Sequence, residues 1–329
     1  MSSPVASAAL VAALASGVIL SIDSPATVSG ARGRDAPTKG TACDGARPPL
    51  AHALFFELRS GAFPGTGHPD AAVHVPPGFD ATERPGLILY LHGWRGCAAA
   101  AFSSDAGACD DAGAAGVDLA SQIDDSGVNA LFIALETRFF AASGEPGQLA
   151  MPGGGRDLIR ELLSERLAGP LGCPVALDAI DRIAVVAHSG GYQGAAGLLT
   201  LGDLPRVSEV VLLDSLYGAD DTFAGWIEHR SRRFGPGPSG PLHFVDLYTS
   251  GGGTADPSRA LARRTRDALT RAAMPNAVFD DDAETDLLPT MLGRPVVFKR
   301  VPLPHSALPG AYLRAVVEAA GFSRIPSRP

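Results

Sequence analysis

The feature that most constrains the fold of this 329-residue chain is a serine among small residues at the end of an apolar run. Residues 183–186 have the continuous apolar pattern of a strand buried on both faces. Ala187-His188-Ser189-Gly190-Gly191 follows at once, and a helical pattern occupies about 190–201. Such a turn is crowded, so the residues two before and two after the serine must be small, as Ala187 and Gly191 are. The sequence therefore predicts a sharp strand-to-helix turn with Ser189 at its tip.

Strand-like and helix-like segments alternate along the rest of the chain. Strands are predicted at 54–58, 72–75, 87–91, 130–135, 182–187, 210–213, 242–248 and 295–301. Helices are predicted at 112–124, 157–168, 190–201, 257–272 and 309–320. This alternation is typical of an α/β fold with a mostly parallel sheet and helices on both faces.

Composition excludes several classes of protein. With 46% hydrophobic and 19% charged residues, the chain can bury a large core. The net charge is −8 and no basic block is present, so no nucleic-acid partner is expected. The acidic run Asp280 to Asp282, with Glu284 and Asp286, lacks the spacing and central glycine of a calcium loop. The sequence favours a solvated acidic loop there and predicts no metal site.

The N-terminus bears on localisation. Residues 5–22 carry no charge, as in a signal-peptide core or a short membrane span, although no basic residue precedes them. We expect a signal peptide or apolar leader at 1–31, a linker at 32–50, one domain at 51–322 and a tail at 323–329. The favoured location is secreted or periplasmic, with no stable membrane partner once the leader is removed. A membrane-anchored protein is the alternative, and the oligomeric state stays open.

The four cysteines are Cys43, Cys97, Cys109 and Cys173. An even number in an exported chain allows two disulfides, and Cys97 with Cys109 is the local pair. Three connectivities are possible, and the sequence does not choose among them. No C-x-x-C pair is present, which argues against a zinc site.

A serine nucleophile needs a base, and the base must lie where the turn presents the serine. His305 follows the last predicted strand and is the best candidate. An acid must orient that imidazole. Asp214 ends the strand at 210–213 and is favoured, because an unpaired carboxylate at an apolar strand end would be costly. Asp256 follows the next strand and is the alternative acid, although Pro257 after it suits a helix cap.

A developing oxyanion also needs hydrogen-bond donors. The backbone N–H of Gly190 begins the helix after the serine and is one candidate. The second is the N–H of Trp94, in the loop His92-Gly93-Trp94 that follows the strand at 87–91. His92 and Gly93 are expected to brace and turn this loop, and Gly191 to support the turn at the serine.

Together, these segments resemble the α/β-hydrolase fold superfamily over about residues 50–322. LYLHGW matches the oxyanion loop, AHSGG matches the nucleophile elbow with alanine in place of its first glycine, and an aspartate and a histidine follow later strands in the family's order. The resemblance implies an eight-stranded sheet, a catalytic triad of Ser189, His305 and Asp214 or Asp256, and no cofactor.

The implied activity is that of a serine esterase acting on a small-molecule or polymeric carboxylic ester through an acyl-enzyme. An amidase or peptidase with the same triad is one alternative, and a hydrolase-fold protein that binds without catalysis is another. Residues 219–240 are expected to form either a small lid or a surface helix.

Overall fold

The computed structural model describes residues 53–94, 96–102, 116–138, 144–234 and 243–325. All of them belong to one compact unit, Thr41–Pro329. The expected leader and linker, residues 1–50, lie outside the described residues. Among the described residues, no helix is both long enough and apolar enough to cross a bilayer.

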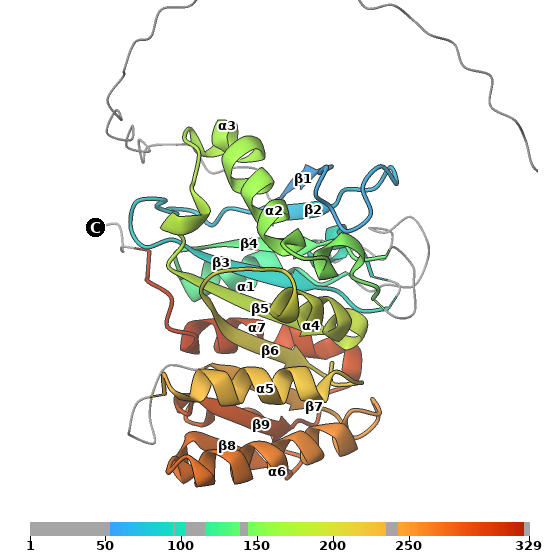
Figure 1. The fold of residues 1–329 in the computed structure, drawn as a ribbon, viewed down its shortest axis with the longest axis vertical. Helices are drawn as coiled ribbons and strands as arrows, with labels where there is room; N and C mark the ends of the chain where they lie inside the picture. Colours follow the sequence, from blue (N-terminus) through green and yellow to red (C-terminus); the bar gives the residue numbers. More distant parts are fainter. Residues whose placement is uncertain (1–52, 95, 103–115, 139–143, 235–242, 326–329) are drawn as a thin grey trace, which may run out of the picture. The chain divides into compact units, whose positions relative to one another are not determined.

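One sheet of nine strands runs through the described part of the chain, in the order β1-β2-β4-β3-β5-β6-β7-β9-β8 (Figure 1). The strands are β1 (Leu54–Phe56), β2 (Ala71–His74), β3 (Gly86–Leu91), β4 (Ala130–Leu135), β5 (Arg182–His188), β6 (Val207–Leu213), β7 (Phe244–Tyr248), β8 (Val278–Asp281) and β9 (Val296–Arg300). The hairpin of β1 and β2 is antiparallel, and β2 joins β4 antiparallel; the other neighbours are parallel.

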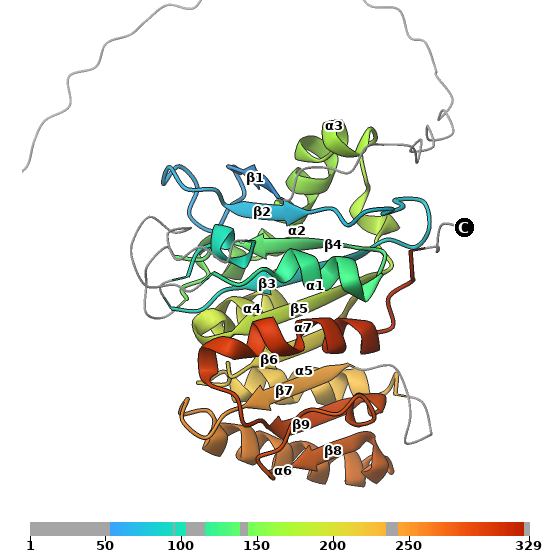
Figure 2. The same ribbon diagram turned by 180° about the vertical axis from the view of Figure 1, so that it is seen from behind.

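Helices cover both faces of this sheet. They are α1 (Leu119–Ser126), α2 (Gly154–Glu161), α3 (Ala168–Leu171), α4 (Tyr192–Thr200), α5 (Asp220–Ser231), α6 (Ala255–Arg271) and α7 (Leu308–Ala319). Figure 1 shows α2, α4, α5 and α6 on one face, and Figure 2 shows α1 and α7 on the other. Two apolar clusters fill the two interfaces, one on each side of the sheet. The central strands β3 and β4 are buried along their whole length, which explains their unbroken apolar runs.

The predicted α/β class, with a mostly parallel sheet between helical layers, is confirmed. All eight predicted strands are present. The sheet nevertheless has one strand more than the expected eight, namely β8 at its edge. The predicted helix at 157–168 is also divided: α2 ends at Glu161, and a π-helical turn over Leu162–Arg166 leads into α3.

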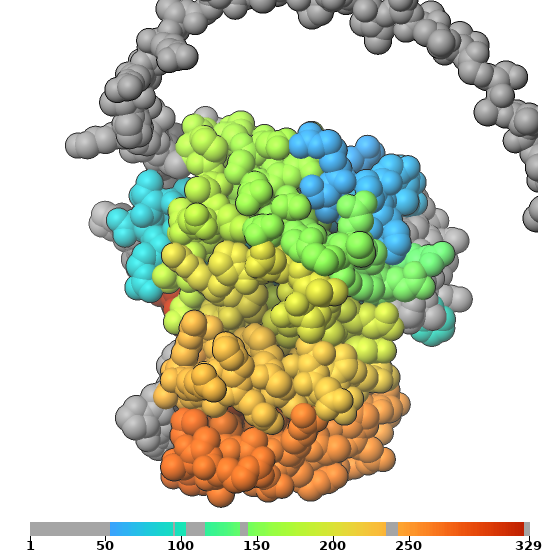
Figure 3. Space-filling view, in the orientation of Figure 1, coloured from blue at the N-terminus to red at the C-terminus, as the bar shows by residue number. Residues whose placement is uncertain are grey.

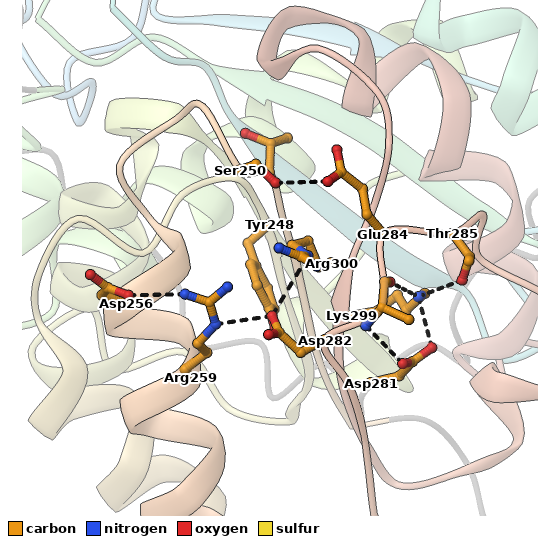
Figure 4. A network of polar contacts seen from close by, with 12 residues as sticks. Tyr248, Ser250, Asp256, Arg259, Asp281, Asp282, Glu284, Thr285, Lys299 and Arg300 are labelled. Carbon is orange, nitrogen blue, oxygen red and sulfur yellow. Dashed lines mark hydrogen bonds and ion pairs between the residues drawn. The ribbon is translucent and has the colours of Figure 1, made fainter.

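The acidic run, expected to be a solvated loop, is in part this ninth strand. Asp280 and Asp281 lie in β8, parallel to β9. The Asp281 carboxylate accepts a hydrogen bond from Lys299 Nζ at 2.8 Å, and Lys299 is fully buried (Figure 4). Asp282 accepts hydrogen bonds from Arg259 Nε at 3.0 Å and from the Tyr248 hydroxyl at 3.1 Å. These carboxylates are therefore neutralised by the chain's own cations.

Residues 219–240 were expected to form either a small lid or a surface helix, and the structure describes 219–234 of them. The helix α5 buries Phe223 and Ile227 completely in the core beneath it. Phe234, just after it, is also buried and stacks on His243 with ring centroids 5.0 Å apart. The segment is thus a surface helix of the α/β layer in its described part; residues 235–242 lie outside the described residues.

Both described cysteines, Cys97 and Cys173, are disulfide-bonded. Cys43 and Cys109 lie outside the described residues, so the pairing of Cys97 with Cys109 remains a prediction.

The C-terminal segment packs against the start of β4. The Asn129 N–H donates to the Ser323 carbonyl at 2.8 Å. Arg324 forms an antiparallel bridge with Val128.

Candidate active site

Ser189 sits in a strained turn between β5 and α4. Its φ is 54°, in the left-handed region that side-chain-bearing residues rarely adopt, and a short 3-10 turn over Ser189–Gly191 leads into α4. Such strain persists only where the surroundings enforce it, and it clusters at functional sites. Ala187 is fully buried, and a Cβ at Gly191 would lie 2.4 Å from the Leu91 carbonyl oxygen. The small residues that marked this turn in the sequence are therefore required by close packing.

His305 and Asp214 meet at the carboxyl edge of the sheet. His305 Nδ1 donates to Asp214 Oδ2 at 2.7 Å, although 91 residues separate the two. Asp214 follows β6 directly, with φ 47°, and His305 begins a 3-10 turn after β9. The Asp214 side chain is fully buried, and that of His305 is 34% exposed. The arrangement suits a carboxylate that orients an accessible imidazole.

The loop between β7 and α6 also binds the Asp214 carboxylate. Thr249 donates its backbone N–H to Oδ1 at 3.1 Å and its hydroxyl to Oδ2 at 2.6 Å, and the Thr254 hydroxyl also donates to Oδ1. Burial alone would raise the pKa of Asp214, but hydrogen bonds from His305, Thr249 and Thr254 outweigh it and lower the pKa. The group is therefore ionised at neutral pH.

The alternative acid, Asp256, lies elsewhere. It occupies the first turn of α6 with 94% of its side chain exposed, and it pairs with Arg259 at 3.0 Å (Figure 4). The carboxylate beside His305 is that of Asp214.

His188, the residue before Ser189, contacts His305 directly. Its Nε2 lies 3.1 Å from the His305 carbonyl oxygen, and the two rings are 4.7 Å apart. A carbonyl oxygen only accepts, so Nε2 carries the proton. Burial, and then the neighbouring His305, lower the pKa of His188 to about 4. His188 is thus a neutral donor that fixes the backbone of His305.

Tyr217 is a further residue of the site, and no motif in the sequence marks it. Its hydroxyl interacts with the Ser189 side chain, and its ring lies 6.4 Å from that of His305. Burial and the Asp214 charge raise its pKa to about 12, so it stays neutral. With 41% of its surface exposed, Tyr217 forms part of the wall beside the serine. Its only sequence signal is its place three residues after Asp214.

The loop after β3 approaches the serine closely. A Cβ at Gly93 would lie 2.5 Å from Ser189 Cβ and 3.1 Å from its hydroxyl oxygen, so only glycine fits there. Trp94, next in the chain, is 57% exposed, and Gly190 is buried at the start of the turn after the serine. The two segments expected to supply oxyanion donors therefore flank Ser189.

His92 anchors this loop through Glu136, a partner missed in the sequence. His92 Nε2 lies 2.8 Å from Glu136 Oε1, and Nδ1 lies 3.0 Å from the Gly93 carbonyl oxygen. The Thr137 N–H also donates to Nε2, at 3.3 Å, so three groups of the surrounding loops hold the ring. Burial lowers the pKa of His92, but the Glu136 charge and hydrogen bonds outweigh this and raise it. Glu136 also accepts the Ala98 N–H at 2.8 Å, which ties the loop to the end of β4.

Within the described ranges, no three His, Cys, Asp or Glu side chains are grouped so as to hold a metal ion. The candidate site brings together a serine hydroxyl, an imidazole, a carboxylate and backbone N–H groups.

Comparisons with known proteins give structural likenesses only. No family model matches the chain, and neither does any curated protein. Among solved structures, a mutant feruloyl esterase module from Clostridium thermocellum, complexed with sinapinate, is 13% identical, with a TM-score of 0.45 over 86% of this chain and 94% of that one. A thermostable esterase is 13% identical, with a TM-score of 0.42 over 81% of this chain and 61% of that one. A CE1 ferulic acid esterase from Anaeromyces mucronatus is 13% identical, with a TM-score of 0.39 over 86% and 93%.

Proposed function

We propose that this chain, which has the α/β-hydrolase fold, is a serine hydrolase that cleaves carboxylic esters. The observation that carries the proposal is the hydrogen bond from His305 Nδ1 to the buried, multiply hydrogen-bonded Asp214, beside the strained Ser189 turn. A carboxylate held this way orients an imidazole and stabilises its protonated form. A structural Asp–His pair alone would not require a left-handed serine packed against Gly93.

In the proposed mechanism, His305 takes the proton of the Ser189 hydroxyl as the oxygen attacks the ester carbonyl carbon. Asp214 stays ionised and stabilises the imidazolium. The N–H groups of Gly190 and Trp94 stabilise the oxyanion of the tetrahedral intermediate. His305 then gives its proton to the leaving alcohol, which leaves an acyl-Ser189 ester. Water, activated by His305, releases the carboxylic acid and restores the serine.

Several contacts hold this machinery in place. His188 fixes the backbone of His305, and the hydrogen bond between His92 and Glu136 fixes the loop that carries Trp94. Positioning of this kind matters because a small displacement of a reacting group costs a large factor in rate.

The test compares p-nitrophenyl butyrate with the matching p-nitroanilide, using wild type and Ser189→Ala. We expect saturable hydrolysis of the ester that Ser189→Ala abolishes, and much slower cleavage of the anilide. Equal rates on the two substrates would favour an amidase with the same triad. Ester hydrolysis that survives in Ser189→Ala would contradict the proposal.

A further inference from the structure

A cavity lies near the amino-terminal end of β6, at the opposite end of the strands from the candidate active site. Its volume is about 660 Å³, within the range of small-molecule sites, and its lining includes Arg206 and Val207 at the start of β6 and Thr200 at the end of α4. Ser189 and Asp214 follow the carboxyl ends of β5 and β6, so the length of a strand, about 20 Å, separates the two places. Figure 3 shows this face of the molecule, with the yellow and gold segments that contain α4 and α5.

The lining of this cavity is strongly cationic. It contains four arginines and one carboxylate, that of Asp203, which pairs with Arg156. The other three, Arg206, Arg230 and Arg233, have no carboxylate partner within the described part of the chain. Arg206 is held in place, since its Nη1 donates to the Ile180 carbonyl at 2.7 Å. Three guanidinium groups thus line one cavity, and the carboxylate whose charge also acts on Arg230, that of Glu209, lies outside the lining and pairs with Arg182.

The burial of Arg230 in this arrangement costs free energy. Its Nε is buried and has no hydrogen-bond partner among the described residues. Burial, and then the charge of Arg233, lower the pKa of Arg230, so the site disfavours its positive charge. The Glu209 charge offsets part of this effect without reversing it. A buried unpaired donor and neighbouring like charges are both costly, and a bound anion would relieve both.

An aromatic ring lies against the same guanidinium. The Cζ atom of Arg230 is 6.0 Å from the centre of the Trp226 ring, and Trp226 also lines the cavity. The apolar side chains of Leu201 and Leu204 line the same space. The cavity therefore offers flat and apolar surface next to its cations.

We propose that this cavity binds a small organic anion, with its oxyanion group on Arg206, Arg230 and Arg233 and a flat apolar body against Trp226. Guanidinium groups match the oxygens of carboxylates and phosphates, which makes an oxyanion the fitting charge. The proposal is independent of the proposed ester hydrolysis, because none of these residues belongs to the candidate active site.

Isothermal titration calorimetry with benzoate tests the site. Benzyl alcohol serves as the neutral counterpart, and inorganic phosphate tests whether the apolar body is needed. We expect benzoate to bind one to one, more tightly than either, and more weakly as salt is added. In the double variant Arg230→Met, Arg233→Met, binding should weaken at least about tenfold, because two charge-assisted hydrogen bonds are lost.

Arg232→Met is the matched control, since Arg232 caps the same helix but does not line the cavity. It should bind benzoate as wild type does. Circular dichroism checks folding, and the single variant Arg233→Met, at an exposed residue, replaces the double variant should that one misfold. Absence of benzoate binding to wild type, equal binding of benzyl alcohol, or equal losses in Arg232→Met and the cavity variants would each overturn the proposal.

Trp226 gives an independent readout of where the ligand sits. The chain has two tryptophans, so Trp94→Phe leaves Trp226 as the only one. Benzoate should change the fluorescence of Trp94→Phe with the affinity found by calorimetry. An unchanged spectrum at saturating benzoate would place the bound anion outside this cavity.

Discussion

His305 Nδ1 donates a hydrogen bond of 2.7 Å to Asp214 Oδ2, and Asp214 receives three further hydrogen bonds from Thr249 and Thr254. The carboxylate is thus ionised and fixed before any substrate arrives. Of the two candidate acids, Asp214 and Asp256, Asp214 is therefore the one in contact with the imidazole.

Asp214→Asn should lower kcat on an ester by about 10³- to 10⁴-fold, because the amide neither orients the imidazole correctly nor stabilises its charge. Asp256→Asn is the control and should stay near wild type, since it loses only an exposed pair with Arg259. Steady-state kinetics measure both. A large loss in Asp256→Asn with an active Asp214→Asn would reverse the assignment of the acid.

His188→Phe should lower kcat by roughly tenfold with little change in KM, because it removes one hydrogen bond to the His305 backbone. His188→Gln keeps an N–H donor and should recover part of the activity. Above pH 5, the shape of the pH–rate profile should not change, because His188, with a pKa of about 4, is already neutral there. A shifted profile in His188→Phe would mean that His188 takes part in proton transfer.

Gly93→Ala should abolish most activity, because its Cβ would lie 2.5 Å from Ser189 Cβ and must displace either the loop or the serine. Gly225→Ala is the matched control: nothing lies within 4 Å of its new Cβ, and alanine favours the helix by up to about 1 kcal/mol. Melting curves and ester kinetics on both variants check this. Full activity in Gly93→Ala would contradict the close approach of the loop to the serine.

Asp246, on β7, should make stability depend on pH. It is fully buried, and burial raises its pKa to about 7, although an interaction with the Ser258 hydroxyl favours the charged form. A raised pKa means that the folded state binds the proton more tightly than the unfolded state. The free energy of unfolding should therefore fall as pH rises from about 4 to 7, and the full penalty applies above pH 7.

Asp246→Asn removes this titration. It should match wild type near pH 4 and exceed its stability by a few kcal/mol at pH 8, as measured by urea unfolding. Asp267→Asn, at an exposed position on α6, is the control and should leave the pH dependence unchanged. A wild-type stability that does not fall between pH 4 and 7 would contradict a buried, protonated Asp246.

Much of the fold could be predicted because the buried strands of a parallel sheet leave a direct signal. The apolar runs at β3, β4 and β5 are long and unbroken, and the small residues around Ser189 are required by sterics. The strand β8 was missed because its acidic residues read as a loop. Its partners, Lys299 and Arg266, are distant in the sequence and neutralise it only once the sheet has formed.

The candidate site could be predicted only in part, for a similar reason. Asp214 and Asp256 both follow strands, and the choice depends on how the loop after β7 brings Thr249 and Thr254 onto one of them. Glu136 gains its role through a hydrogen bond with His92, which lies in the loop after a neighbouring strand. No local pattern encodes such pairings, because tertiary packing creates them.

The central claim is that Ser189 is an activated nucleophile. Treatment with a fluorophosphonate, followed by peptide mass spectrometry, tests it most directly, with Ser189→Ala as the comparison. We expect a single phosphonylated residue, Ser189, and no labelling of the folded Ser189→Ala variant. A folded wild type that stays unlabelled, or a label on another serine, would contradict the account.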